Sequence, residues 1–397
     1  MKTFSLTSIL RFSAMPVFFV AICAILLRAD DALQPIDVSA FVDSAHHWRN
    51  VHGSSDNPLK PRPGHPSYKP EQVREIAANV LLFQCDNGGW PKNYDMCAIL
   101  NDEEKAAVLS IKNRKTVTFD NETTHSQVAY LAKAYAQIKE PAYRDACVRG
   151  LDFMLSAQLP GGGFPQRWPD PEGYHAYITF NDRVMVGILT VLRDAGNGVN
   201  GFAWLDTARR EKCRNAQERG TACILACQYR NAKGELVAWG QQHDPKTLLP
   251  AKGRGFELPS LCAQDTPEII RYLAGFEQPA PEIIAAIRAG VAWLEQSKIT
   301  GIRVEEFNST PVKFRFHDTD IDRRVVNDPS APPIWARMYE METNRPMFCG
   351  RDQKKVYAFA EVDRDRRTGY DWYGYWPADE LSGLYPAWLK KHGFSKK

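Results

Sequence analysis

A turn motif recurs along this chain at intervals of about 70 residues, and this period restricts the possible folds more than any other feature of the sequence. In each copy a glutamine leads into a turn that ends in an aromatic residue. The copies are Gln84-Cys85-Asp86-Asn87-Gly88-Gly89-Trp90-Pro91, Gln158-Leu159-Pro160-Gly161-Gly162-Gly163-Phe164-Pro165, and a weaker one that begins at Gln228 and reaches Trp239-Gly240-Gln241. A repeat of this length is typical of a solenoid or toroid, in which similar units pack side by side.

The segments that precede the turns have helical periodicity. Their apolar residues are Val73, Ile76, Val80 and Phe83 before the first turn, and Tyr143, Cys147, Leu151 and Met154 before the second. Residues 213–228 precede the third. With a second helix after each turn, the sequence predicts a mainly α fold. We expect an (α/α) toroid or partial barrel of about three helix-pair repeats, with a small β element near the C-terminus.

A second element recurs between the turns. Thr118-Phe119-Asp120-Asn121 and Thr179-Phe180-Asn181-Asp182 each precede a helix, and Glu257-Leu258-Pro259-Ser260 is the expected third copy. In a toroid, equivalent loops gather at one end of the ring. Taken singly, each acid is an ordinary helix N-cap. Taken together, they predict a cleft in which Asp120 and Asp182 lie close to each other.

The last part of the chain has a different pattern. Val312, Phe314 and Phe316 alternate with polar residues, as do Val356, Ala358 and Ala360, and alternation predicts strands. Between them we expect a helix that carries Ile334, Trp335, Met338 and Tyr339. Residues 366–369 have the composition of a turn.

The N-terminus has the pattern of an export signal. Lys2 and Arg11 precede an apolar run from Ala14 to Leu27, which is shorter than the ~20 residues of a membrane span. We predict a signal peptide over residues 1–32 and a secreted or periplasmic protein with no stable membrane association; the alternative is a short anchor. Residues 33–69 are expected to be a linker with one short helix. Eight cysteines follow the signal, and we expect them to be either thiols in the core or disulfides.

Several residue types at the predicted cleft suit an acidic carbohydrate. Asp120 and Asp182 can hold calcium, with Asn121 adding an amide oxygen, or they can serve as the acid and base of an inverting glycosidase. Arg254 lies between two glycines on the third loop. Further guanidinium groups suited to sugar carboxylates are those of Arg323, Arg324, Arg337 and Arg351. A net charge of +3 and the lack of a long basic run argue against a nucleic-acid partner.

From about residue 70 to the C-terminus, an ordered series of motifs resembles the pectate lyases of polysaccharide lyase family 10. Besides the elements above, it includes Trp90-Pro91-Lys92-Asn93, Gly163-Phe164-Pro165-Gln166, Glu257-Leu258-Pro259-Ser260-Leu261, Ile334-Trp335-Ala336-Arg337-Met338-Tyr339-Glu340, Thr343-Asn344-Arg345-Pro346, Gly350-Arg351-Asp352 and Tyr385-Pro386-Ala387-Trp388-Leu389. The resemblance implies that residues 70–397 form a catalytic domain. It also implies calcium-assisted anti β-elimination on α-1,4-polygalacturonate (pectin), by a protein that we expect to be a monomer.

The resemblance also implies roles for individual residues. Asp120 and Asp182 would bind Ca²⁺, and Arg254 would be the base. The residues that would bind substrate are Asn121, Thr124, Arg323, Arg337 and Arg351. Arg324 is an alternative to Arg323. Glu122 and Arg183 depart from the small or acidic neighbours expected there. Two other classes stay open: a metal-free glycoside hydrolase, and a non-catalytic protein that binds an acidic glycan.

Overall fold

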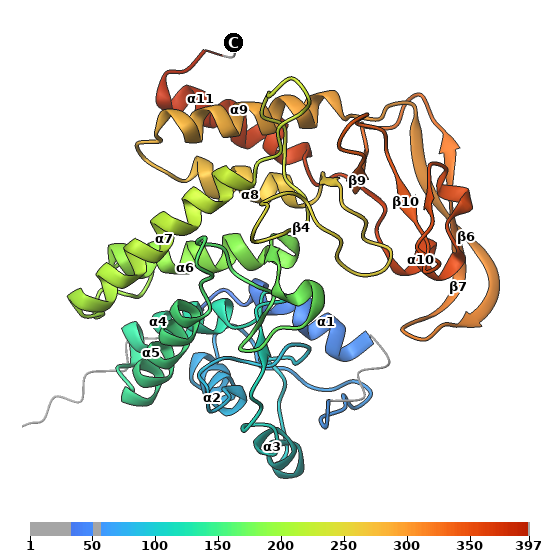
Figure 1. Cartoon of the computed structure of the whole chain (residues 1–397). Coiled ribbons are helices and arrows are strands. Elements are labelled where there is room, and N and C mark those ends of the chain that lie inside the picture. The colour runs from blue at the N-terminus through green and yellow to red at the C-terminus, as the bar shows by residue number, and fades with distance from the viewer. Residues whose placement is uncertain (1–32, 51–56, 396–397) are drawn as a thin grey trace, which may run out of the picture. The chain divides into compact units, whose positions relative to one another are not determined.

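Helix pairs form most of the structure. In the computed structural model, which describes residues 33–50 and 57–395, α4 (His125–Ile138) packs with α5 (Pro141–Ser156) and α6 (Val184–Asn197) with α7 (Thr207–Cys227). A third pair consists of α8 (Asp265–Ala274) and α9 (Pro281–Gln296), and α2 (Val73–Phe83) precedes them (Figure 1). The predicted toroid-type, mainly α fold of about three helix pairs is confirmed. Within the described residues, no helix combines the length and hydrophobicity that crossing a membrane requires.

A glutamine side chain joins successive repeats. Gln84, Gln158 and Gln228 each donate from Nε2 to one carbonyl of their own turn and to one carbonyl of a later helix. The carbonyls of the turns belong to Gly88, Gly162 and Val237, and those of the helices to Ala146, Ala216 and Ala286. The repetition of one bond pattern confirms that the three turns are structurally equivalent.

Two-residue strands bring the loops together at one end of the repeats. β1 (Val117–Thr118) pairs with β2 (Arg167–Trp168), β3 (Ile178–Thr179) with β4 (Gln242–His243), and β5 (Leu261–Cys262) with β9 (Met338–Tyr339). Each strand that precedes a helix therefore pairs with a strand that follows the turn of the next repeat. The expected third copy over 257–260 is wrong by five residues, since β5 is the strand that leads into α8 and the equivalent segment is 262–265.

The predicted helix over residues 334–339 is also wrong. Trp335 lies in β8 (Trp335–Ala336), and its Nε1 donates to the carbonyl of Leu294 at 2.8 Å. Trp90 and Trp239 make the same bond to a carbonyl of their preceding helices, at 2.7 and 2.8 Å. Residues 334–339 are thus a fourth copy of the turn. The sequence conceals it because a long hairpin separates this aromatic residue from α9.

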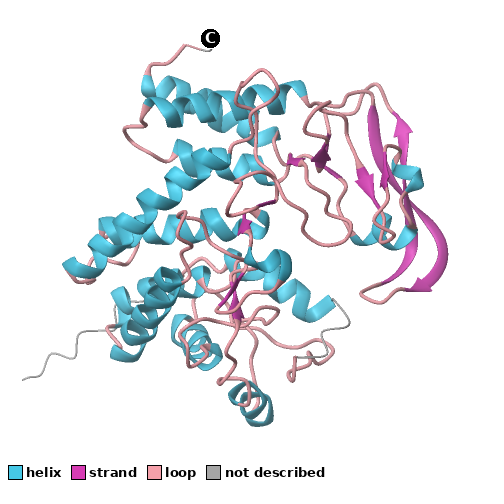
Figure 2. Ribbon diagram, viewed as in Figure 1, coloured by secondary structure: helices cyan, strands magenta, loops and turns pink. Residues whose placement is uncertain are grey.

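That hairpin is the largest β element (Figure 2). It consists of β6 (Ile302–Lys313) and β7 (Asp318–Asn327), with Glu306 opposite Arg323. The remaining strands are β10 (Phe348–Cys349), β11 (Lys355–Val356) and β12 (Tyr373–Gly374). The strand predicted over 356–360 covers only Val356, because a 3₁₀ turn follows at Phe359–Glu361, and the predicted turn at 366–369 lies in α10 (Arg364–Gly369). The last helix is α11 (Tyr385–His392).

All eight cysteines in the described part of the chain are free thiols, and seven of them are buried. Of the two alternatives for these residues, the structure therefore supports core thiols. Cys85 is typical, because burial raises the pKa of its thiol to about 11 and so suppresses the reactive thiolate. The predicted signal peptide lies outside the described residues.

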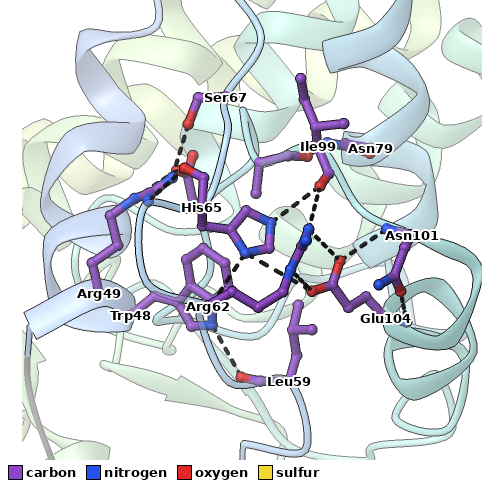
Figure 3. Close-up of polar contacts among 12 residues, drawn as sticks. Trp48, Arg49, Leu59, Arg62, His65, Ser67, Asn79, Ile99, Asn101 and Glu104 are labelled. Carbon is purple, nitrogen blue, oxygen red and sulfur yellow. Dashed lines mark hydrogen bonds and ion pairs between the residues drawn. The ribbon is translucent and has the colours of Figure 1, made fainter.

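The segment expected to be a linker packs against the rest of the chain. It contains α1 (Val42–Asn50), followed after a gap by residues 57–69, and α3 (Asp102–Leu109) lies beside it. Arg49 forms an ion pair with Asp95 at 2.6 Å, and Arg62 forms one with Glu104 at 2.7 Å (Figure 3). Trp48 is buried and donates from Nε1 to the carbonyl of Leu59.

This packing leads to a stability prediction. Trp48→Ala is expected to lower the free energy of unfolding by about 3–5 kcal/mol, because it removes a large buried side chain and leaves a cavity. Val42→Ala, on the same helix at a position that is 62% exposed, is the control and should change stability by less than ~0.5 kcal/mol. Denaturant titration of both variants checks this. Equal stability of the two would mean that residues 34–50 are dispensable for the fold.

Candidate active site

Asp120 and Asp182 lie in the loops that precede α4 and α6. Each loop contains two residues with a left-handed backbone, Asn121 and Glu122 in one (φ 51° and 56°), Asp182 and Arg183 in the other (φ 52° and 60°). Asp182 is therefore equivalent to Asn121, so the two carboxylates occupy adjacent rather than matching positions of the repeat. Both loops nevertheless bond to the same segment, because the N–H of Phe119 donates to the carbonyl of Gln166 and that of Thr179 to the carbonyl of Phe164.

The two carboxyl groups lie close enough for each to shift the pKa of the other. Burial and the charge of Asp120 raise the pKa of Asp182 well above its ordinary value. Burial acts in the same direction on Asp120, but Lys92, the bond from Asp182 and the charge of Arg254 outweigh it, so the pKa of Asp120 is lowered. The charge of Asp120 therefore favours the protonated form of Asp182.

Three polar side chains surround Asp120. The ammonium group of Lys92 forms an ion pair with Oδ2, and Gln166 donates from Nε2 to Oδ1 at 2.8 Å. His175 in turn contacts Oε1 of Gln166 through Nδ1. Burial lowers the pKa of His175 to about 4, so this histidine is neutral at ordinary pH.

The donor set suits a hard cation. Carboxylate oxygens are the ligands that calcium prefers, and the ammonium of Lys92 already shows that this position attracts positive charge. Within the described residues no group of three or more His, Cys, Asp or Glu side chains is arranged to hold a metal. Calcium takes six to eight oxygen ligands. Asp120 and Asp182 therefore fit such an ion only if water, amide groups and the carboxylates of a bound substrate complete the shell.

Arg254 faces the carboxylate pair from the third loop, and 44% of its side chain is exposed. Its guanidinium donates to Oε1 of Glu257, and its backbone N–H donates to Oε2 at 2.8 Å. The group also lies over the rings of Phe256 and Tyr370, 5.1 and 5.5 Å from their centroids. Burial acts to lower the pKa of Arg254, but the charge and the hydrogen bond of Glu257 outweigh it and raise that pKa.

The other predicted arginines connect to this cluster through shared partners. Arg337 is buried, lies 4.2 Å from the centroid of Tyr370, and donates to the carbonyl of Asp371. Arg323 forms an ion pair with the carboxylate of the same Asp371 at 3.2 Å. Arg351 lies 6.0 Å from the centroid of Phe256 and is paired with Asp365.

Two predicted substrate-binding residues have other partners in the structure. Thr124 is fully buried, and its hydroxyl donates to the carbonyl of Thr118 and accepts from the N–H of Trp90. Both bonds lie within the first turn, so they fix the Thr124 side chain there. Asn121 is also buried and donates from its amide to Oδ1 of Asn93.

The charged neighbours that depart from the expected pattern interact with each other. Arg183 lies within 4.0 Å of the carboxylate of Glu122 and within 3.7 Å of that of Glu268. These two carboxylates, rather than that of Asp182, pair with the charge of Arg183. Arg324 pairs with Glu305 and is 59% exposed, whereas Arg323 is 22% exposed and pairs toward Asp371, so the two adjacent arginines have different surroundings.

Five polar residues of the cluster are absent from the predicted set: Lys92, Gln166, Gln241, Glu257 and Tyr370. The first three had a detectable signal, since each follows its aromatic turn residue by two positions. Glu257 stands three residues after Arg254, a spacing that is too common to be informative. Nothing near Tyr370 in the sequence points to a contact with residues more than a hundred positions earlier.

Comparison with known proteins shows similarity to lyases. The family model described as "Pectic acid lyase" matches residues 84–381. A family 10 polysaccharide lyase from Cellvibrio cellulosa, solved as an aspartate-to-alanine mutant in complex with trigalacturonic acid, is 30% identical, with a TM-score of 0.69 over 81% of this chain and 93% of that chain. A second structure of a family 10 polysaccharide lyase from the same organism is 28% identical, with a TM-score of 0.66 over 85% and 100%. A search of curated protein sequences finds no match.

Proposed function

Because this chain belongs to the pectic acid lyase family, the family 10 polysaccharide lyases, we propose that it cleaves polygalacturonate by β-elimination with Arg254 as the base and with Ca²⁺ held by Asp120 and Asp182. The enzyme is a pectate lyase. The observation that carries the assignment of residues is that Asp120, Asp182 and Arg254, from three successive loops, lie close enough to shift one another's pKa values.

The cluster suits abstraction of a proton next to a carboxylate. The proton on C5 of galacturonate is weakly acidic, and its removal places negative charge on the neighbouring carboxylate. Calcium, when bound, would neutralise part of that charge. The guanidinium groups of Arg337 and Arg351 would hold substrate carboxylates in place. Arg254 would accept the C5 proton, and the electrons of the C5–H bond would form a C4–C5 double bond. The C4–O bond would break, and the glycosidic oxygen would leave with its electron pair and take a proton from water.

A base must first lose its own proton, which is difficult for arginine. Glu257 raises the pKa of Arg254 in the free protein, so the unprotonated form is scarce at neutral pH. Activity is therefore expected to rise as the pH becomes alkaline. A bound divalent cation near Arg254 would act in the opposite direction to Glu257 and would lower its pKa.

Membership of the pectic acid lyase family argues against a hydrolase that would use Asp120 and Asp182 as its acid and base. A non-catalytic glycan-binding protein, the other alternative, would leave its ligand intact.

The test uses purified protein and polygalacturonate, with added calcium or with a chelator. A calcium-dependent rise in ultraviolet absorbance would reveal the unsaturated product and support the proposal. New reducing ends without absorbance would identify a hydrolase, and an unchanged polymer would identify a binding protein.

Because the substrate is extracellular pectin, we also propose that the enzyme is exported and that residues 1–32 are removed. We further propose that it acts as a monomer.

A prediction concerns Lys92, whose ammonium group forms an ion pair with the oxygen of Asp120 that a cation would need as a ligand. Lys92→Met is expected to tighten calcium binding to the substrate-free protein by roughly tenfold, since it removes a competing positive charge. Calorimetric titration with calcium measures this. Lys115→Met, at an exposed position, is the control. Weaker calcium binding by Lys92→Met would show that the metal binds elsewhere.

A further inference from the structure

A continuous chain of hydrogen bonds joins Arg254 to the carboxylate pair through the protein interior. Glu257 accepts from Arg254 and, at 3.0 Å, from the hydroxyl of Tyr370. Gln241 donates from Nε2 to that hydroxyl at 3.3 Å and to Oδ1 of Asn181 at 3.0 Å. The chain ends where Asn181 donates to Oδ2 of Asp182 at 2.6 Å. Its central members, Glu257, Tyr370, Gln241 and Asn181, are all at least 92% buried.

Glu257 is the residue that holds Arg254. It is 2% exposed and accepts three hydrogen bonds, two of them from Arg254 itself. Gly253 makes room for it, because a Cβ at that position would lie 2.7 Å from Oε2 of Glu257 and 2.6 Å from Oε1 of Gln242. The loop is therefore built around a buried carboxylate that fixes both the backbone and the guanidinium of Arg254.

We propose that Glu257 and Tyr370 are positioning residues of the lyase reaction, which aim Arg254 at the substrate and regulate how readily it gives up its proton. Glu257 favours the protonated guanidinium by its charge. Tyr370 moderates that effect, because its hydroxyl donates to the same oxygen and disperses the negative charge. This inference rests on the proposed role of Arg254 as base.

The charged and titratable groups that face Arg254 come from several elements. From its own loop there is Glu257, and from the segment before β12 there is Tyr370. The others are Asp120, Asp182, Tyr174, His175 and Arg366, from the loops before α4 and α6, from the 3₁₀ turn Gly173–Ala176, and from α10. Glu257 and Tyr370 both contact Arg254 directly, and they are also hydrogen-bonded to each other.

The experiment compares how kcat/KM depends on pH in Glu257→Gln, Tyr370→Phe and the wild type. Glu257→Gln removes the negative charge, so the rising limb should move to lower pH by about one pH unit or more. Tyr370→Phe strengthens the pairing of Glu257 with Arg254, so the limb should move to higher pH. Tyr373→Phe, a partly buried tyrosine in the same segment, is the control and should leave the limb in place.

Opposite shifts of the two variants would support the proposal, since a merely structural role would lower activity at every pH without moving the limb. A shared loss of activity with an unmoved limb would overturn it, as would wild-type profiles in both variants. If Glu257→Gln fails to fold, the direction of the shift in Tyr370→Phe decides. Arg254→Ala is measured alongside: if that variant keeps wild-type turnover, the proposed base is wrong, and this failure is distinct from that of Glu257 and Tyr370.

Discussion

Arg254→Ala is expected to reduce kcat by ~10²–10⁴-fold, the range that a positioned general base contributes, while leaving affinity for polygalacturonate nearly unchanged. The reason is that the proposed site assigns substrate binding to other guanidinium groups, among them that of buried Arg337. Single-turnover formation of the unsaturated product measures the first quantity, and calorimetric titration with oligogalacturonate measures the second.

A matched control for this variant exists on the hairpin. Arg324→Ala removes a guanidinium that is 59% exposed and paired with Glu305, so it should change kcat by less than about twofold. Arg254→Lys adds a second comparison, since lysine has an ordinary pKa of ~10.4 against ~12.5–13.8 for arginine. Any residual activity of this variant should rise at lower pH than that of the wild type. Reduced affinity with unchanged turnover in Arg254→Ala would instead make Arg254 a binding residue.

Asp182→Asn is expected to lower activity by about a hundredfold or more and to abolish its dependence on calcium, because a metal contributes several kcal/mol of transition-state stabilisation. Calorimetry with calcium, and activity measured with and without a chelator, provide the two readouts. Calcium dependence that persists in this variant would contradict the assignment of Asp182 as a ligand.

The same variant should be more stable than the wild type when calcium is absent. The pKa of Asp182 is raised in the folded protein, so the stability that this group contributes is present below its unfolded pKa and is lost as the pH rises through the folded pKa. An uncharged amide removes that loss, and thermal melts at neutral and alkaline pH in the presence of a chelator should show a higher Tm.

Asp265→Asn is the matched control for the loss of calcium dependence. Asp265 occupies the position of Asp182 in the third repeat, is buried, and has its pKa raised by burial to about 6. It should gain stability at high pH in the same way but keep calcium-dependent activity, since Asp120 lies in another repeat. Loss of calcium dependence in Asp265→Asn would mean that the metal is not confined to the first two loops.

The sequence by itself determined the repeat, the helix pairs and the gathering of Asp120, Asp182 and Arg254 at one end. These follow from local spacing: a helix and a turn of given length return the chain to an equivalent place in each repeat. The same reasoning failed at residues 334–339, where a hairpin of more than twenty residues is inserted into the turn and hides its relation to the other three.

Only the tertiary structure decided which side chains meet within the cluster. Tyr370 reaches Glu257 over 113 residues. Arg323 pairs with Asp371 whereas its neighbour Arg324 pairs with Glu305, and Thr124 is enclosed by the turn of Trp90. The physical reason is that such contacts and the pKa shifts that follow from them depend on packing between segments that are remote in the chain. Residue types and their spacing predict which groups are available, whereas burial and partners determine what each of them can do.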